Sequence, residues 1–271
     1  SQTAKLAADA GAAKHLLFDG AAPSVGQKIR LPALGRTLSR IAKEGADAFY
    51  RGEIAAEIAA TLQALGGFLS EEDLAGCEAD WVEPIRTAYR DHEVLQIPPN
   101  GQGITALVIL NLLTASGRHH DPLSAERFHQ SIEFARLAYA VRDAHVSDPA
   151  TRHTTPDAIL SAETTQALLK QFDPENRNNT ITLPKLPDAD TIYLSVVDRD
   201  GLAVSFINSV YSGFGTGIVT EKSCIALQNR GSCFVVEEDH PNAIGGGKRP
   251  MHTIIPGMAL KDGLPAISFG V

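Results

Sequence analysis

Apolar residues recur at the spacing of amphipathic helices in the first part of the chain, and Gly or Pro interrupts the pattern between them. A helix is predicted in residues 1–16, before the break at Asp19-Gly20. Ser70 followed by three acidic residues is typical of a helix start, and helix capping is a sufficient role for those acids. The other predicted helices run through Leu34, Leu38, Ile41 and Ala42 up to Gly45, from about Gly52 to Leu65, and from Ser124 to about Val146.

Short runs of β-branched and aromatic residues predict strands, most of them late in the chain. Residues 192–197 and 202–207 flank Asp198-Arg199-Asp200-Gly201, which predicts an antiparallel hairpin with Gly201 as the left-handed turn residue. Three glycines follow at 213, 215 and 217, and this density indicates a bulge or a close approach of backbones. The other predicted strands are 84–85, 94–97, 223–227, and a pair through 254–255, 258–260 and 265–269.

One stretch imitates a dinucleotide-binding fingerprint. Residues 101–106, GQGITA, match G-x-G-x-x-A between a predicted strand and an apolar helix. However, Pro98-Pro99 stand where the strand should enter the turn, and a second long helix follows instead of a parallel strand. We therefore favour the alternative that these glycines let a helix N-terminus pack closely against a sheet.

The composition is that of an ordinary globular protein of 271 residues, in one large domain or two small ones. A net charge of -8 without clustered Lys and Arg argues against a nucleic-acid partner. No apolar run reaches the ~18 residues that a membrane helix needs. Three cysteines without a C-x-x-C pair favour a reducing compartment, so we expect a cytoplasmic protein, with the periplasm as the alternative.

No motif predicts a metal or a cofactor. Residues 245–248, GGGK, do not form a P-loop, because Arg249 stands where Ser or Thr would hold magnesium. Five histidines lack the i, i+4 placement of a helical metal site, namely His119, His120, His129, His145 and His153.

Four ordered motifs resemble the catalytic subunit of the γ-glutamyltranspeptidase family. They are Thr191, SVVDRDG at 195–201, FGTGIV at 214–219 and GKRP at 247–250. Three upstream stretches resemble the large subunit of the family: GADAFYRGEIA at 45–55, LGGFLSEEDLAGCEADWVEPI at 65–85 and PPNGQGITAL at 98–107. The resemblance covers nearly the whole chain.

The resemblance implies an N-terminal-nucleophile hydrolase with an α/β fold, the αββα sandwich in which two stacked antiparallel sheets lie between helical layers. Residues 1–190 would be the mostly helical C-terminal part of the large subunit. Residues 191–271 would be the N-terminal part of the catalytic subunit, truncated at its C-terminus, in the same domain. Polar, proline-containing residues at about 173–190 predict a mobile linker, which would give slack after cleavage, although a plain interdomain linker would have the same composition.

In this family the precursor cleaves itself before a threonine, which implies processing between Asp190 and Thr191 and an αβ heterodimer of the two pieces. The new N-terminal Thr191 would be nucleophile and base in one residue, because its α-amine, with a reference pKa of about 8, can accept the hydroxyl proton. Ser209 aligns with the residue that orients the nucleophile. Without the resemblance, Thr191 would be an ordinary strand residue and Ser209 a solvated one.

The chain departs from the transpeptidases where they hold the amino and carboxyl groups of glutamate. Tyr211, Arg230, Cys233 and His252-Thr253 stand at those positions, and the acid that would pair with a substrate ammonium is missing. A guanidinium binds a carboxylate with two hydrogen bonds, so Arg230 favours an anionic substrate.

The predicted substrate-binding residues are therefore Tyr211, Arg230, His252 and Thr253. Arg230 has a structural alternative, an ion pair with Asp198 or Glu237.

LQNRGSCF at 227–234, HPN at 240–242 and KRPMHTIIPG at 248–257 resemble the γ-glutamyltranspeptidase-like amidohydrolases. That branch includes oxamate amidohydrolase, an enzyme of purine-nitrogen use, and proteins labelled cephalosporin acylase. It implies hydrolysis of a small acid amide such as oxamate through a threonyl ester. The family's oxyanion-hole Gly-Gly pair and its substrate-binding Arg would lie beyond the two ends of this sequence.

Three alternatives remain. The first is a γ-glutamyltranspeptidase or γ-glutamyl hydrolase that acts on glutathione-type substrates. The second is a cephalosporin-acylase-like enzyme. The third is an unprocessed, non-catalytic binding protein.

Overall fold

The computed structural model describes residues 2–181 and 191–271. The chain divides into two compact units. Among the described residues, the first unit contains 2–81 and 210–229, and the second contains 82–181, 191–209 and 230–271. Each unit therefore combines residues from both sides of the expected processing site.

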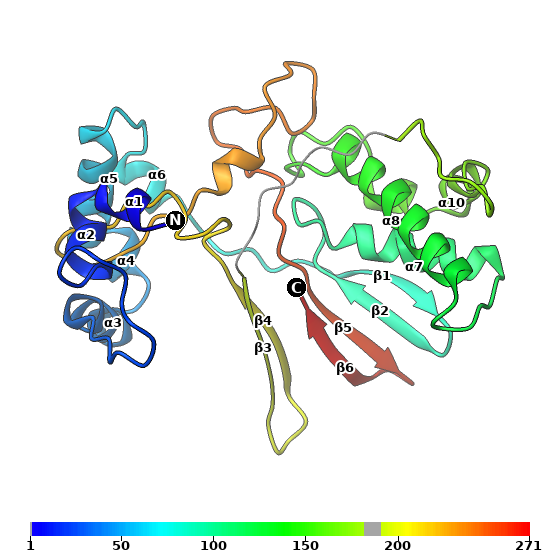
Figure 1. Cartoon of the computed structure of the whole chain (residues 1–271), viewed down its shortest axis with the longest axis horizontal. Helices are drawn as coiled ribbons and strands as arrows, with labels where there is room; N and C mark the ends of the chain where they lie inside the picture. The colour runs from blue at the N-terminus through cyan, green and yellow to red at the C-terminus, as the bar shows by residue number, and fades with distance from the viewer. Residues whose placement is uncertain (1, 182–190) are drawn as a thin grey trace. The chain divides into compact units, whose positions relative to one another are not determined.

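The first unit is a group of helices that encloses the extended segment 210–229 (Figure 1). Its small core consists of Leu6, Ala12, Leu17, Ala33, Val219 and Cys224. Asp9 joins helix and segment, because its carboxylate accepts hydrogen bonds from the amides of Ala12 and Val219 at 2.8 and 3.0 Å. The helices are α1 (Gln2–Ala7), α2 (Ala10–Leu16), α3 (Pro32–Glu44), α4 (Asp47–Tyr50), α5 (Glu53–Ala64) and α6 (Glu71–Ala75).

The single helix predicted in residues 1–16 is divided into α1 and α2, and α4 was not predicted, but the ends predicted at Gly45 and Ser70 are confirmed. Gly45 closes α3 with a positive φ of 80°, and its amide donates to the carbonyl of Ile41. Ser70 caps α6 in a capping box with Asp73, so the acidic residues after Ser70 do serve the helix start.

The strand predicted at 223–227 is wrong, since only an isolated bridge between Val219 and Ala226 forms there. Side-chain oxygens accept the amide hydrogens of Ser223 and Ile225, two residues of the expected strand. Glu57 on α5 accepts from the amides of Lys222 and Ser223 at 2.6 and 3.1 Å, and Cys224 has a positive φ of 59°. A residue in this left-handed conformation ends a strand.

The second unit contains two antiparallel sheets. The larger has the order β1-β2-β5-β6, and the smaller is the hairpin β3-β4. The strands are β1 (Ile85–Tyr89), β2 (His92–Gln96), β3 (Ile192–Val197), β4 (Ala203–Asn208), β5 (Pro256–Lys261) and β6 (Leu264–Gly270). Apart from the strand at 223–227, every strand predicted from sequence is confirmed, within a few residues at its ends.

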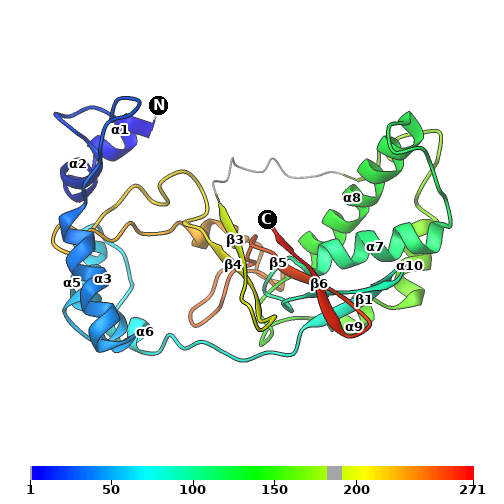
Figure 2. The same cartoon turned by 90° about the horizontal axis from the view of Figure 1, so that it is seen from below.

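Helix α7 lies along the larger sheet, and α8 packs against α7 (Figures 1 and 2). Leu107 on α7 meets Val94 and Ala259 of the sheet, while Ile104, Val108 and Leu112 pack with Phe134 and Leu137 of α8. A helix covered on two sides is apolar nearly all round, which explains the apolar sequence of α7. The helices of this unit are α7 (Ile104–Ser116), α8 (Ala125–His145), α9 (Pro156–Ile159) and α10 (Ala162–Leu169), with a 3-10 turn, η1 (Arg230–Cys233).

Residues 178–181, the last described before the expected processing site, are attached to α8 by a buried ion pair. Glu133 and Arg136 meet at 2.6 Å, Glu133 accepts from the Asn178 amide at 2.9 Å, and Arg136 donates to the carbonyls of Asn178 and Ile181. The pKa of the Glu133 carboxyl is lowered overall. Burial by itself acts to raise this pKa, but the hydrogen bonds from Asn178 and Arg136 and the positive charge of Arg136 have the larger, opposite effect. The fold as described is mixed α/β with two antiparallel sheets. None of its described helices is long and apolar enough to cross a membrane.

Candidate active site

Thr191 and Ser209 meet at one end of the hairpin. Ile192 pairs with Asn208, so one further step of the same register brings Thr191 opposite Ser209. The two hydroxyl oxygens lie 3.2 Å apart, within hydrogen-bond distance. Thr191 is exposed and Ser209 is half-buried. Asp190, the other residue of the expected processing bond, lies outside the described residues.

The far end of the hairpin fixes this register. The Asp198 carboxylate accepts hydrogen bonds from the amides of Asp200 and Leu202, both at 2.9 Å, and Gly201 has a φ of 85°. A side chain that closes its own turn specifies which residues pair in the strands. The local sequence at 198–201 therefore decides that Thr191 faces Ser209.

The hairpin is held beside β6 by polar contacts. Ser205 donates a hydrogen bond to the carbonyl of Phe269 at 3.0 Å, and the hydroxyls of Tyr193 and Ser268 lie 3.0 Å apart. Gly270 makes this approach possible, since a Cβ atom there would lie 2.7 Å from the Tyr193 ring. The start of β3, and with it Thr191, is thereby attached to the larger sheet.

Three of the predicted substrate-binding residues form a cluster in the second unit. Arg230 begins η1, is only 4% exposed, and donates from Nη1 to the hydroxyl oxygen of Thr253. His252, next to Thr253, has its pKa lowered to about 4 by burial and by the positive charge of Arg230. His252 is therefore neutral at neutral pH. Its Nδ1 accepts from the Ile254 amide at 3.4 Å, which leaves the proton on Nε2 and makes that nitrogen a donor.

Tyr211 belongs to the first unit. It is buried and has a φ of 79°, an unusual backbone conformation for a tyrosine. The structure thus forms two groups of predicted site residues within the second unit. One is Thr191 with Ser209, and the other is Arg230 with His252 and Thr253.

Sequence analysis missed the residues that hold the His252-Thr253 segment. The His252 amide donates to the Asn100 carbonyl at 2.9 Å, and the Gln102 amide donates to the His252 carbonyl at 2.8 Å. The side chain of Gln102 donates to the Thr253 carbonyl at 2.7 Å. Gln102 lies within the Gly-x-Gly stretch and Asn100 directly before it, and this position was the signal that could have identified them.

The glycines of this stretch serve packing, as the alternative to a dinucleotide site predicted. A Cβ atom on Gly103 would lie 2.4 Å from Oε1 of Gln96, which is at the end of β2. Gly103 therefore lets the start of α7 approach the sheet more closely than any other residue would.

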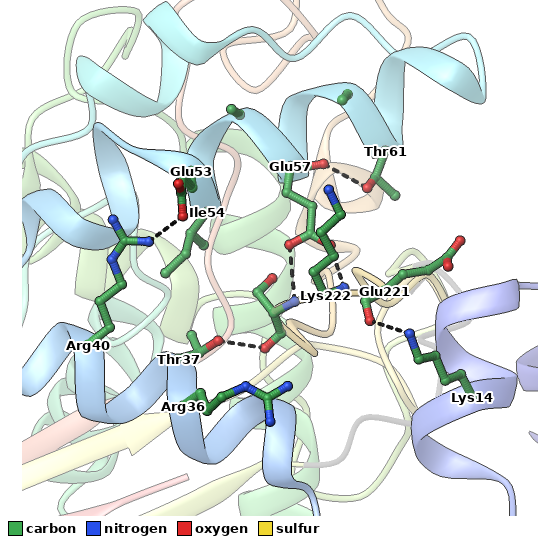
Figure 3. Close-up of a pocket in the computed structure, with 13 residues that line it drawn as sticks. Lys14, Arg36, Thr37, Arg40, Glu53, Ile54, Glu57, Thr61, Glu221 and Lys222 are labelled. Carbon is green, nitrogen blue, oxygen red and sulfur yellow. Dashed lines mark hydrogen bonds and ion pairs between the residues drawn. The ribbon is translucent and has the colours of Figure 1, made fainter.

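A large cavity in the first unit contains none of the predicted site residues. It measures about 1210 Å³ and lies between α3, α5 and residues 221–223 (Figure 3). Its charged residues are largely engaged within the unit. Arg40 pairs with Glu53 at 2.7 Å, Glu57 holds two backbone amides, and Lys14 donates to the carbonyl of Glu221. Among residues 2–181 and 191–271, no group of three or more His, Cys, Asp or Glu side chains is placed to hold a metal ion.

Comparison with known proteins agrees with these motifs over the whole chain. The family model described as Gamma-glutamyltranspeptidase matches residues 1–271. The Glutathione hydrolase-like YwrD proenzyme of Bacillus subtilis is 35% identical over 93% of this chain and 47% of its own length. The Oxamate amidohydrolase proenzyme of Klebsiella pneumoniae is 36% identical over 93% of this chain and 48% of its own length.

Among solved structures, the cephalosporin acylase of Bacillus halodurans superposes with a TM-score of 0.83 at 39% identity. The match covers 92% of this chain and 45% of that protein. The chain thus spans about half the length of the curated relatives it matches.

Proposed function

This chain belongs to the γ-glutamyltranspeptidase family, and from that premise we propose that it is part of a self-processing amidohydrolase whose nucleophile is Thr191. The observation that carries the proposal is the 3.2 Å approach of the Thr191 and Ser209 hydroxyls at the start of the hairpin. Residues 1–190 are the end of the large subunit and 191–271 the start of the catalytic subunit. In the complete protein the two sheets take part in an αββα sandwich.

Processing and catalysis use the same hydroxyl. Before processing, the Thr191 oxygen attacks the carbonyl of Asp190, the peptide C–N bond breaks, and an ester forms. Water hydrolyses that ester and leaves a carboxylate on Asp190 and a free amine on Thr191. In catalysis the amine accepts the hydroxyl proton, the oxygen attacks the substrate amide, ammonia or an amine leaves, and water hydrolyses the threonyl ester. The Ser209 hydroxyl orients the attacking oxygen.

The substrate class follows from the charge of the Arg230 cluster. A buried guanidinium beside a neutral histidine donor provides hydrogen bonds to an anion. A substrate ammonium would find no acid at the positions that this family uses for it. We therefore favour a small amide that carries a carboxylate, such as oxamate, and the relative named oxamate amidohydrolase supports this choice. Tyr211 remains a proposed substrate contact.

A γ-glutamyl hydrolase is the second candidate. The relative named Glutathione hydrolase-like YwrD proenzyme is about as similar to this chain as the oxamate enzyme, and the Glutathione hydrolase proenzyme of Escherichia coli is 32% identical. The solved cephalosporin acylase adds a third acyl group to test.

The proposed cleavage leaves two pieces that stay associated as an αβ heterodimer. In the first unit, Asp9 and Glu57 hold backbone amides of residues 219, 222 and 223, which lie on the other side of the cleavage site. In the second unit, β2 pairs with β5 along four residues of each strand. Hydrogen bonds and a shared core therefore connect both pieces without the peptide bond.

The test is intact-mass analysis of the full-length protein during incubation at neutral pH, beside a Thr191→Ala variant. We expect the wild type to split between Asp190 and Thr191 and the variant to remain whole. Release of ammonia from oxamate, compared with release from γ-glutamyl amides, then identifies the substrate. A wild type that never splits would leave the non-catalytic binding protein as the better description.

A further inference from the structure

The side chain of Gln102 connects helix α8 to the segment that carries His252 and Thr253. Its Oε1 accepts a hydrogen bond from Nη1 of Arg142 at 2.9 Å, and its Nε2 donates to the carbonyl of Thr253 at 2.7 Å. The Gln102 residue precedes α7, Arg142 lies near the end of α8, and Thr253 precedes β5. One amide group thus joins three elements that are distant in sequence.

Arg142 is a fixed partner for this amide. Its side chain is 3% exposed, and Nε and Nη2 contact Oδ1 of Asp143 at 2.7 and 2.6 Å. The guanidinium also lies over the ring of Tyr139, 4.5 Å from its centroid. A guanidinium held by Asp143 and by the Tyr139 ring does not turn freely to follow Gln102, so Gln102 has to adapt to Arg142.

The chemistry of the two groups leaves Gln102 a single orientation. Arginine only donates hydrogen bonds, so the oxygen of the Gln102 amide must face Arg142. The nitrogen then faces Thr253, whose carbonyl oxygen only accepts. Reversing the amide would oppose donor to donor on one side and acceptor to acceptor on the other, so the Arg142 charge sets the direction of the bond to Thr253.

The backbone of Gln102 acts on the neighbouring residue. Its amide donates to the His252 carbonyl at 2.8 Å, and the His252 amide donates to Asn100 at 2.9 Å. Gln102 therefore holds two consecutive carbonyls, those of His252 and Thr253. The peptide groups on both sides of Thr253 are thereby held, which fixes the direction of its Cα–Cβ bond. The hydrogen bond from the His252 amide to Asn100 holds the preceding peptide group, so the direction of the His252 Cα–Cβ bond is fixed as well.

We propose that Gln102, oriented by Arg142, is a positioning residue that sets the His252 and Thr253 side chains, and through Thr253 the Arg230 guanidinium, for the carboxylate of the substrate. This inference rests on the proposed function. It gives a role to Gln102, the glutamine of the Gly-x-Gly stretch. Neither the family motifs nor the packing of the glycines explains why a glutamine stands there. Gln102 and Arg142 do not themselves contact substrate.

The test compares Gln102→Met and Gln102→Glu with wild type in the full-length protein. Methionine keeps the length of the side chain and removes both hydrogen bonds. Glutamate keeps the acceptor for Arg142 but turns a carboxylate oxygen toward the Thr253 carbonyl, so it breaks only the second contact. Gln63→Met is the matched control, because Gln63 also donates from Nε2 to a backbone carbonyl, that of Leu69, in the first unit.

Two readouts separate positioning from simple stability. We expect both Gln102 variants to raise the KM for oxamate about tenfold, while kcat and the rate of self-cleavage change less than twofold, since Thr191 and Ser209 lie on the hairpin. We also expect amide hydrogen exchange in residues 251–254 to accelerate at least tenfold in both variants. Gln63→Met should change neither quantity.

The inference is overturned if exchange in 251–254 stays at the wild-type rate, or if KM stays unchanged in a folded Gln102 variant. It is also overturned if KM, kcat and self-cleavage all fall in step with the melting temperature, because a merely structural residue would behave in that way. Hydrogen exchange needs no activity. A wild type that neither splits nor hydrolyses oxamate would therefore contradict the proposed function, while the exchange data would still decide whether Gln102 positions the segment.

Discussion

Thr191 and Ser209 face each other across the open end of a two-stranded hairpin, with 3.2 Å between their hydroxyl oxygens. The turn at Asp198–Gly201 is at the opposite end, six residue pairs away. The turn fixes which residues of β3 and β4 pair, and this pairing continues along both strands to Thr191 and Ser209. A shift of the pairing by one residue would turn every side chain of the shifted strand to the other face of the hairpin.

Ser209→Ala should slow self-cleavage about tenfold, because loss of a hydrogen bond that orients the nucleophile corresponds to about 1–1.5 kcal/mol. Ser209→Thr should restore the rate, since it keeps the hydroxyl. Intact mass over time measures the effect. Ser195→Ala, on an exposed strand position of the same hairpin, is the control and should cleave like wild type. Equal rates for both alanine variants would remove Ser209 from the mechanism.

Arg230→Met should remove the preference for an anionic substrate. We expect wild type to hydrolyse oxamate more efficiently than its neutral analogue oxamide. In the variant, the binding free energy for oxamate should weaken by about 1.5–3 kcal/mol, which raises KM roughly tenfold or more. Oxamide hydrolysis should change little. If both substrates lose activity equally, Arg230 supports the local fold and does not read the charge of the substrate.

The pKa of His252, about 4, predicts a particular pH dependence. In the unfolded chain a histidine titrates near pH 6.5, so between about pH 6.5 and 4 the unfolded state binds more protons than the folded state. This contribution to stability is therefore fully present above pH 6.5 and is lost as the pH falls toward 4. His252→Gln should flatten that part of the curve of unfolding free energy against pH, measured with urea. An NMR titration of His252 with a midpoint near 6.5 would contradict this assignment.

Two glycine substitutions in the first unit should have opposite effects. A Cβ on Gly11 would lie 1.7 Å from the carbonyl oxygen of Val219, so Gly11→Ala must push helix α2 and the segment 210–229 apart. We expect a loss of about 1–3 kcal/mol of unfolding free energy. Gly35 lies in α3 with no atom within 4 Å of its Cβ position, and Gly35→Ala should stabilise by roughly 0.5–1 kcal/mol. Urea unfolding distinguishes the two outcomes.

Two phenylalanines of α8 test the core of the second unit. Phe134 is fully buried between α7 and α8, and Phe134→Ala should cost about 3–5 kcal/mol. Phe128 on the same helix is 54% exposed, so Phe128→Ala should cost much less. Similar losses in the two variants would mean that α8 is buried on a different face from the one described.

Local chemistry made much of the fold predictable. Asp198 and Gly201 close a turn by their own side chain and backbone preference, Ser70 and Gly45 mark helix ends, and the alternating runs form strands. Each of these features depends on residues within a few positions of one another. The strand expected at 223–227 failed for the complementary reason: Glu57, far away in sequence, takes the amides of Lys222 and Ser223 where that strand would begin.

The sequence by itself determined most of the elements, the turn of the hairpin that joins Thr191 to Ser209, and, through its motifs, the family. Only the tertiary structure decided that Arg230 contacts Thr253, that His252 stays neutral, and that Arg142 orients Gln102. Periodicity and turn chemistry report short-range preferences of the backbone. Burial of a charge and the direction of an amide depend on which distant segments pack together, and that is settled only when the core forms.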